Sequence, residues 1–172
     1  KWHGAGIPPV ISLDENGEPT FLHVLSEDNL KSHRYYYVRR KKGKWKQTPI
    51  CDSNHQWNSS YLARDKEGIL HAYVIVGKGY LEGGYMNRHG GGCIEEWISQ
   101  DKGNSWKKNR DLTPNSKPYR GWRYNNIQPV VRPDGKIVDG MLLFYGWKDQ
   151  NKPEAKAFLL HEEVSFDPIR DK

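Results

Sequence analysis

The chain has 172 residues and a net charge of +6, and no apolar run approaches the roughly 18 residues that a membrane-spanning helix needs. Hydrophobic residues make up 35% and aromatic residues 12% of the chain, which excludes a disordered protein. The basic balance suits an anionic partner such as an acidic glycan, although it is also common in proteins that are simply soluble. The densest basic run, residues 39–42, is expected at a hairpin tip. This position disfavours nucleic acid, and we expect no membrane partner.

The chain begins with Lys1-Trp2-His3-Gly4 and shows neither an initiator methionine nor a signal peptide there. We therefore expect an upstream part of the protein to be missing from this sequence.

Three segments share one template, in which a short apolar strand is followed by a turn containing Asp and Gly and then by a second apolar strand. The predicted strand pairs are 7–13 with 19–25, 59–63 with 69–76, and 127–131 with 141–147. Asp-Gly or Asn-Gly between such runs is a hairpin signal, because glycine accepts a positive φ without steric penalty. A second hairpin follows in the first two units, at 35–40 with 44–50 and at 93–99 with 105–108. In the third unit only one further strand is predicted, at 155–162.

Units of four antiparallel strands that repeat every ~40–50 residues are typical of β-propeller blades. The sequence therefore predicts an all-β chain, with residues 1–172 forming one propeller portion and blades at about 3–50, 54–114 and 122–172. An ordinary β-sandwich is the alternative. Because a propeller has ~4–8 blades, upstream blades are expected to complete the ring, on the same polypeptide or on a cleaved partner chain.

Residues 99–106 read Ser-Gln-Asp-Lys-Gly-Asn-Ser-Trp, which matches the Asp-box of sialidase-like propellers. We expect the Asp and Ser side chains to bond backbone groups of a tight turn, and the Trp to pack between sheets. This motif indicates a fold and says almost nothing about chemistry.

Segments 3–9, 54–59 and 125–129 resemble the His/Asn-Asn-x-Pro openings of blades in the bacterial BNR-repeat propellers that act on plant and algal polysaccharides. The pattern is most similar to the long ulvan lyases, seven-bladed propellers that cleave a sulfated, uronate-containing algal polysaccharide. The resemblance implies a histidine pair with arginine partners at the centre of the ring, which it does not assign to residues of this chain. It also implies a secreted, periplasmic or cell-surface bacterial protein.

One face of such a propeller collects the starts of first strands and the loops between second and third strands. β-Elimination at a uronate needs a cation or donor on the carboxylate, a base for the C5 proton, and an acid for the leaving oxygen. The candidate catalytic residues are His55, Arg88, Arg123 and Tyr124, and the candidate substrate-binding residues are His3, Tyr119, Arg120, Trp122, Asn125 and Asn126. Packing is the alternative role for each Arg and Tyr, and Glu27, Asp28 and Glu82 are the candidates for a hydrolase.

A structural zinc site is a second hypothesis. Cys51-x-x-x-His55 and His89-x-x-x-Cys93 supply two Cys and two His, a set that tetrahedral zinc accepts. We prefer His33, Cys51, His89 and Cys93 as ligands, which leaves His55 for substrate. A Cys51–Cys93 disulfide, or two unrelated buried thiols, is the alternative.

The leading functional hypothesis is a polysaccharide lyase that cleaves an acidic polysaccharide, with zinc in a structural role only. A glycoside hydrolase of the sialidase or rhamnosidase kind is the runner-up. A non-catalytic carbohydrate-binding propeller is the third possibility.

Overall fold

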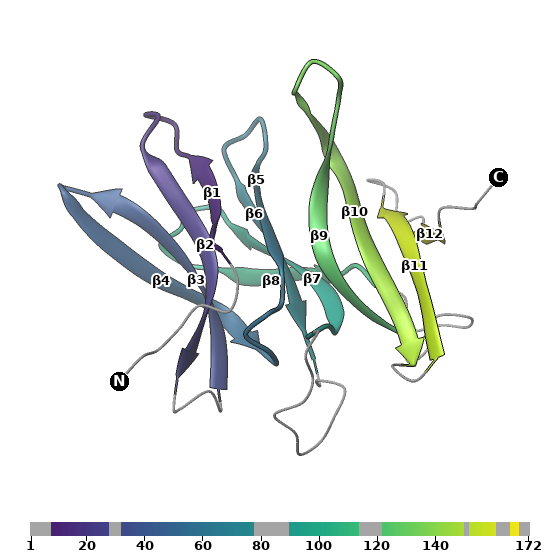
Figure 1. The fold of residues 1–172 in the computed structure, drawn as a ribbon. Helices are drawn as coiled ribbons and strands as arrows, with labels where there is room; N and C mark the ends of the chain where they lie inside the picture. The colour runs from purple at the N-terminus through teal and green to yellow at the C-terminus, as the bar shows by residue number, and fades with distance from the viewer. Residues whose placement is uncertain are drawn as a thin grey trace.

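The computed structural model describes residues 8–27, 32–77, 90–113, 122–149, 152–160 and 166–168. These residues form three four-stranded antiparallel sheets that follow one another along the chain (Figure 1). The first sheet contains β1 (Val10–Leu13), β2 (Pro19–Glu27), β3 (Ser32–Lys41) and β4 (Lys44–Ser53). The second contains β5 (Ser60–Arg64), β6 (Leu70–Val76), β7 (Cys93–Ser99) and β8 (Lys107–Asp111). The third contains β9 (Arg123–Val131), β10 (Ile137–Asp149), β11 (Lys152–Leu160) and β12 (Phe166–Pro168).

The prediction of an all-β chain made of antiparallel sheets is confirmed. In each sheet the strands pair in sequence order, so every neighbour is joined by a hairpin or a loop. The described residues contain no helix, and therefore none that is long and apolar enough to cross a membrane. The described residues also do not close into a ring.

Turn chemistry explains where the hairpins reverse. At the β1–β2 turn the Asp14 carboxylate accepts the backbone N–H groups of Asn16 and Glu18, at 2.8 and 2.9 Å, and Gly17 adopts φ 77°. The β5–β6 turn repeats this design, because Asp65 accepts the N–H of Ile69 at 2.7 Å. An Asp side chain that satisfies backbone donors fixes a short turn locally.

The sheets pack face to face through two separate apolar cores. One lies between the first and second sheets and consists of Leu22, Val24, Tyr35, Tyr37, Ile50, Leu62, Leu70, Ala72 and Val74. The other lies between the second and third sheets and consists of Tyr73, Ile75, Ile94, Leu112, Tyr124, Ile127, Leu142, Phe144, Phe158 and Leu160. Alternate residues of β6 enter the two cores, as the period of two in a strand requires. The first strands also meet, since β1 contacts β5 and β5 contacts β9.

The Asp-box turn between β7 and β8 joins the first two sheets. Asp101 accepts hydrogen bonds from the Ser99 hydroxyl at 2.7 Å and from the backbone N–H of Ser105 at 2.9 Å. Gly103 adopts φ 80° and donates its N–H to Ser99 Oγ at 2.8 Å. Trp106 packs edge-on against Tyr37 of the first sheet, with ring centroids 5.5 Å apart. The expected bonding and packing of this motif are therefore present.

Two differences from the predicted strands stand out. The third sheet has a fourth strand, β12, which the sequence analysis did not predict because three residues carry too little pattern. Strand β9 begins at Arg123 and not at 127, so the Asn-Asn pair lies inside a strand.

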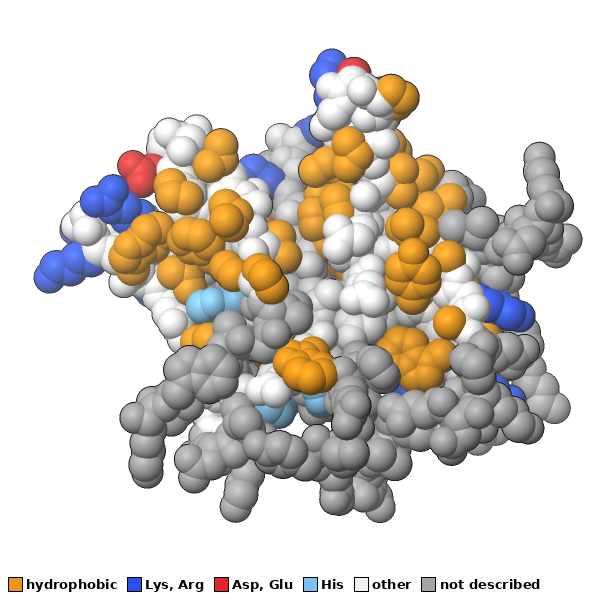
Figure 2. All heavy atoms as spheres, in the orientation of Figure 1, with side chains coloured by type: hydrophobic (Ala, Val, Ile, Leu, Met, Phe, Trp, Pro, Cys, Tyr) orange, Lys and Arg blue, Asp and Glu red, His pale blue; other side chains and the backbone are white. Residues whose placement is uncertain are grey.

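Apolar side chains are also exposed on the outer sheets. Figure 2 shows them gathered over the first sheet and over β9 and β10. The exposed large apolar residues on these sheets are Ile11, Leu13, Trp45, Val131, Ile137 and Tyr145.

Candidate functional site

Two histidines lie close together near the connection between the first and second sheets. His33 is the second residue of β3 and lies opposite Ser26 of β2 and Ser53 of β4. His55 lies in the connection from β4 to β5. The centroids of the two imidazole rings are 6.2 Å apart. The structure thus places His33, predicted as a zinc ligand, beside the predicted catalytic residue His55.

Hydrogen bonds fix the tautomer of His33. The Ser26 hydroxyl donates to Gln56 Oε1 at 3.3 Å and lies 2.9 Å from His33 Nδ1. A hydroxyl has a single proton to donate, so with that proton directed to Gln56 we assign Ser26 as the acceptor of the His33 Nδ1–H. Burial, and next the neighbouring His55, lower the pKa of His33 below its ordinary value of 6.5. The ring is therefore neutral at pH 7, and its Nε2 carries the lone pair of a base.

His55 has the opposite arrangement. Its Nδ1 accepts the backbone N–H of Trp57 at 3.0 Å. In the neutral ring the proton then sits on Nε2, which becomes a hydrogen-bond donor. The Trp57 ring stands edge-on to His55, with centroids 5.6 Å apart. Neighbouring imidazoles thus supply one basic nitrogen and one N–H group, the two kinds of group that proton abstraction next to a carboxylate requires.

Buried amides hold this part of the chain in place. Asn58 is fully buried, accepts the N–H of Gly91 at 2.7 Å and donates to the Ser53 hydroxyl at 3.1 Å. Gly90 has φ 62°, and a Cβ there would overlap the Asn58 amide and lie 3.2 Å from His55 Nδ1. A glycine is required at this position, so that the backbone can pass close to His55.

Asn125 is a second buried amide, and it links the third sheet to the β4–β5 connection. It is 2% exposed, accepts the N–H of Ser59 at 2.9 Å and donates to the Trp57 carbonyl at 3.2 Å. Both polar atoms of this amide make hydrogen bonds within the chain, and the substrate-binding role of Asn125 stays a prediction. Asn126 is exposed and adopts φ 59°.

Tyr124, the residue before Asn125, is buried as well. It is 1% exposed and packs edge-on against Phe144 and Phe158, at 5.7 and 5.6 Å, inside the core between the second and third sheets. The ring therefore packs in this core, and the catalytic role of Tyr124 stays a prediction. Trp122 packs on Phe158 at 5.5 Å and carries Lys156 Nζ 5.6 Å from its ring centre. Arg123 is partly buried at the start of β9.

Seven of the candidate residues lie outside the described part of the chain, namely His3, Asp28, Glu82, Arg88, His89, Tyr119 and Arg120. Their proposed roles stay predictions.

Three of the four predicted zinc ligands, His33, Cys51 and Cys93, lie in the described part of the chain. Cys51 and Cys93 are both free thiols, so the disulfide alternative is wrong for this structure. Burial, with smaller contributions from the Glu95 and Asp52 carboxylates, raises the pKa of Cys51 to about 12 and keeps it protonated. Among the described residues no group of three or more His, Cys, Asp or Glu side chains could hold a metal ion. Because His89 lies outside these residues, zinc stays a prediction that metal analysis of the purified chain can test.

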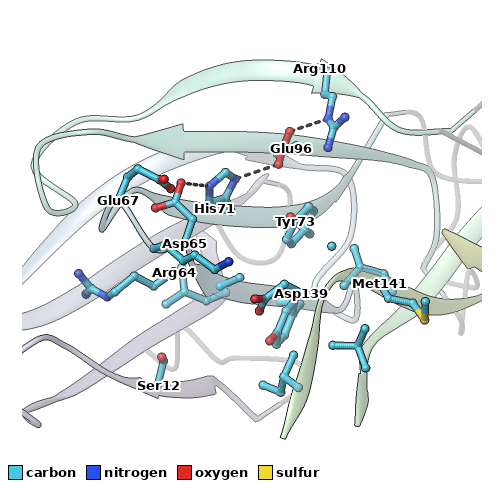
Figure 3. A pocket seen from close by; sticks show the side chains of 18 residues that line it. Ser12, Arg64, Asp65, Glu67, His71, Tyr73, Glu96, Arg110, Asp139 and Met141 are labelled. Atoms are coloured by element: carbon cyan, nitrogen blue, oxygen red, sulfur yellow. Dashed lines mark hydrogen bonds and ion pairs between the residues drawn. The ribbon is translucent and has the colours of Figure 1, made fainter. Parts of the chain in front are cut away.

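A cavity of about 570 Å³ lies between the second and third sheets, at the end where their first hairpins turn. Figure 3 shows His71 on its wall between the carboxylates of Asp65 and Glu96. Its Nδ1 lies 2.9 Å from Glu96 and its Nε2 lies 3.1 Å from Asp65. The hydrogen bond with Glu96, with a smaller contribution from Asp65, raises the pKa of His71 against the effect of burial. The ring is therefore a charged bridge.

Glu96 is the buried centre of this cluster, at 2% exposure. Burial alone would raise its pKa, but hydrogen bonds from His71, Asn109 and Arg110 outweigh that effect and lower the pKa to about 2. The bonds from Asn109 and Arg110 are both 2.7 Å long. Sequence reasoning missed this cluster, although Glu96 alternates with Ile94 and Ile98, and a carboxylate in a core-facing register needs a cation.

The two histidine sites differ in what they can do chemically. Both nitrogens of His71 are bonded to carboxylates, which leaves no basic atom for a substrate. His33 keeps a basic nitrogen beside the N–H of His55, so we take these two residues, the histidine pair, as the candidate active site.

Comparison of the chain with protein-family models and with curated protein sequences gives no match.

Proposed function

We propose that this chain is part of a polysaccharide lyase that cleaves a uronate-containing, acidic polysaccharide by β-elimination. The observation that carries the proposal is the histidine pair, in which a neutral His33 with a basic Nε2 stands 6.2 Å, centroid to centroid, from His55. The net charge of +6 favours an anionic substrate.

In the proposed reaction His33 Nε2 takes the C5 proton of the uronate. The electrons of that C–H bond form the C4–C5 double bond as the C4–O glycosidic bond breaks. The leaving oxygen then takes the proton back from the imidazolium, so atoms and charge balance. The Nε2–H of His55 donates a hydrogen bond to the uronate carboxylate, which stabilises the charge that develops there. Arg123 is the proposed cationic partner of the same carboxylate.

We also propose that the three sheets are blades of a β-propeller. The repeated order of strands, the contact of each first strand with the next, and the face-to-face cores all support this arrangement.

The lyase proposal is tested by incubating uronate polysaccharides with the chain and following the ultraviolet absorbance of the new conjugated double bond. His33→Gln is expected to lower the initial rate by about 10²–10⁴-fold, the usual contribution of a general base. His23→Gln is the matched control, because His23 is a partly buried histidine of the neighbouring strand β2 whose Nε2 makes no hydrogen bond with any residue that the structure describes.

Each alternative gives a different result. New reducing ends without new absorbance would show a hydrolase. Binding without either product would show a carbohydrate-binding protein. Equal rates for His33→Gln and His23→Gln would reject the histidine pair as the active site.

A further inference from the structure

The tip of the β3–β4 hairpin is the most basic stretch of the chain. Residues 39–46, called the basic tip below, contain six Lys or Arg side chains and no carboxylate. Pairing between the strands sets Arg39 opposite Lys46 and Lys41 opposite Lys44. Lys42 and Gly43 adopt φ 51° and 75°, the values of the two-residue turn that suits a hairpin. Figure 2 shows the resulting Lys and Arg atoms at the left edge of the molecule.

Little negative charge offsets these cations. Arg39 and Lys46 both donate to one neutral oxygen, Asn104 Oδ1, at 2.8 and 3.1 Å. Two cations therefore converge beside a neutral acceptor. Lys41, Lys42 and Lys44 are exposed and make no ion pair with any residue that the structure describes, and the Arg40–Glu18 contact is long, at 3.8 Å.

An aromatic ring stands among the cations. Trp45 is 54% exposed and packs against Phe21, with ring centroids 5.3 Å apart. This contact holds the ring in one orientation while more than half of it faces solvent. An exposed tryptophan supplies an apolar face for a sugar ring, and the flanking cations supply partners for sulfate or carboxylate groups.

We propose that the basic tip is a second binding surface for the anionic polysaccharide, separate from the histidine pair. Eight residues of β3 separate Lys41 from His33, which corresponds to roughly 26 Å along an extended strand. Polymer held at the tip is kept at high local concentration near the histidine pair without blocking it. The choice of polymer rests on the proposed function, whereas the binding itself requires no turnover.

Binding to dextran sulfate over a series of NaCl concentrations tests the proposal, with uncharged dextran as the polymer control. In the tip variant Lys41→Ser/Lys42→Asn/Lys44→Ser, asparagine is used at 42 because it tolerates a positive φ. The control variant Lys136→Ser/Lys148→Ser/Lys156→Ser removes the same charge from exposed lysines of the third sheet. Here log K, the logarithm of the association constant, falls as log salt rises. The tip variant should make this slope shallower by about 2, at ~0.7 per lost contact, and the control variant should leave the slope unchanged.

Equal loss in both variants would overturn the proposal, because net charge alone would then explain binding. Tighter binding of single-stranded oligothymidine than of dextran sulfate at equal salt would also overturn it, in favour of nucleic acid. Trp45→Phe locates the contact, since the polymer-induced change in tryptophan emission should largely disappear in this variant. His33→Gln should bind dextran sulfate as the unaltered chain does, so failure of the lyase proposal and failure of this one give different results.

Discussion

At the scale of single residues, the partner of a histidine decides its chemistry. His33 donates a hydrogen bond from Nδ1 to Ser26 and is partly buried. It is therefore neutral, and its Nε2 is basic. His71 stands between two carboxylates and is held in its charged form. Both residues are partly exposed, and each is the second residue of its strand. Neither state can be read from the residue alone, because each depends on side chains from other strands.

Glu96→Gln is expected to destabilise the chain by about 3–5 kcal/mol, because it leaves His71 and Arg110 without their buried anionic partner. Denaturant unfolding followed by tryptophan fluorescence measures this loss. Asp134→Asn is the control: the Lys136–Asp134 pair is exposed and 3.8 Å long, so its loss should cost less than ~1 kcal/mol.

The pH dependence of the Glu96→Gln effect gives a sharper check. Because the pKa of Glu96 falls from 4.5 to about 2, its contribution is complete above pH 4.5 and disappears as the pH falls through 2. Because the pKa of His71 is raised above 6.5, its contribution is complete below pH 6.5 and disappears as the pH rises through the raised value. The difference in unfolding free energy should therefore be largest between pH 4.5 and 6.5. A difference that is flat from pH 2 to 9 would contradict the assigned charge states.

At the scale of elements, turns set the hairpins and the hairpins set the sheets. The Asp-box is the clearest case, since the bonds among Ser99, Asp101, Gly103 and Ser105 that form its turn lie within residues 99–106, and its position was predicted from those residues alone. The contacts that the motif makes with the first sheet were predicted only in part. Trp106 was expected there, but the contact of Gly103 with Tyr37 was not.

Gly103→Ala is expected to destabilise the chain by about 2–5 kcal/mol, since it combines a strained positive φ of 80° with a Cβ that overlaps the Tyr37 ring. Gly17→Ala is its matched control, with φ 77° and no atom within 4 Å of the added Cβ. That variant should lose only the ~1 kcal/mol of the backbone strain. Thermal or denaturant unfolding compares the two, and equal losses would show that the packing against Tyr37 contributes nothing.

Element prediction failed where the pattern was short or was interrupted. Strand β12 has three residues, which is below the length at which alternation can be recognised. Strand β10 passes through Asp139 and Gly140 before its apolar part, so its beginning resembled a turn. The register shift between β9 and β10 at this point accommodates those residues.

At the scale of the whole molecule, two inter-sheet cores hold the sheets together while the first sheet exposes apolar side chains. Leu22, at 0% exposure, and Ile11, at 64%, come from adjacent strands of that sheet. The face that carries Leu22 packs against the second sheet, and the face that carries Ile11 is exposed to solvent.

The double variant Ile11→Ser/Leu13→Ser should change the free energy of unfolding by less than ~1 kcal/mol, because both side chains are already more than 60% exposed. It should also reduce the binding of a hydrophobic dye to the folded chain. Leu22→Ala, which empties the buried side of the same sheet, should instead cost about 2–5 kcal/mol. A large loss of stability in the double variant would mean that these residues are packed in solution.

The sequence by itself determined the antiparallel hairpins, the Asp-box and the basic tip, because each depends on residues within a few positions of one another. Only the tertiary structure decided that His33 lies beside His55, since this follows from the register of β2, β3 and β4 and from the course of the β4–β5 connection. The same long-range packing buried Tyr124 and Asn125 and gathered the His71 cluster. Such contacts join side chains that lie far apart in the sequence, and the local pattern of a strand carries no record of them.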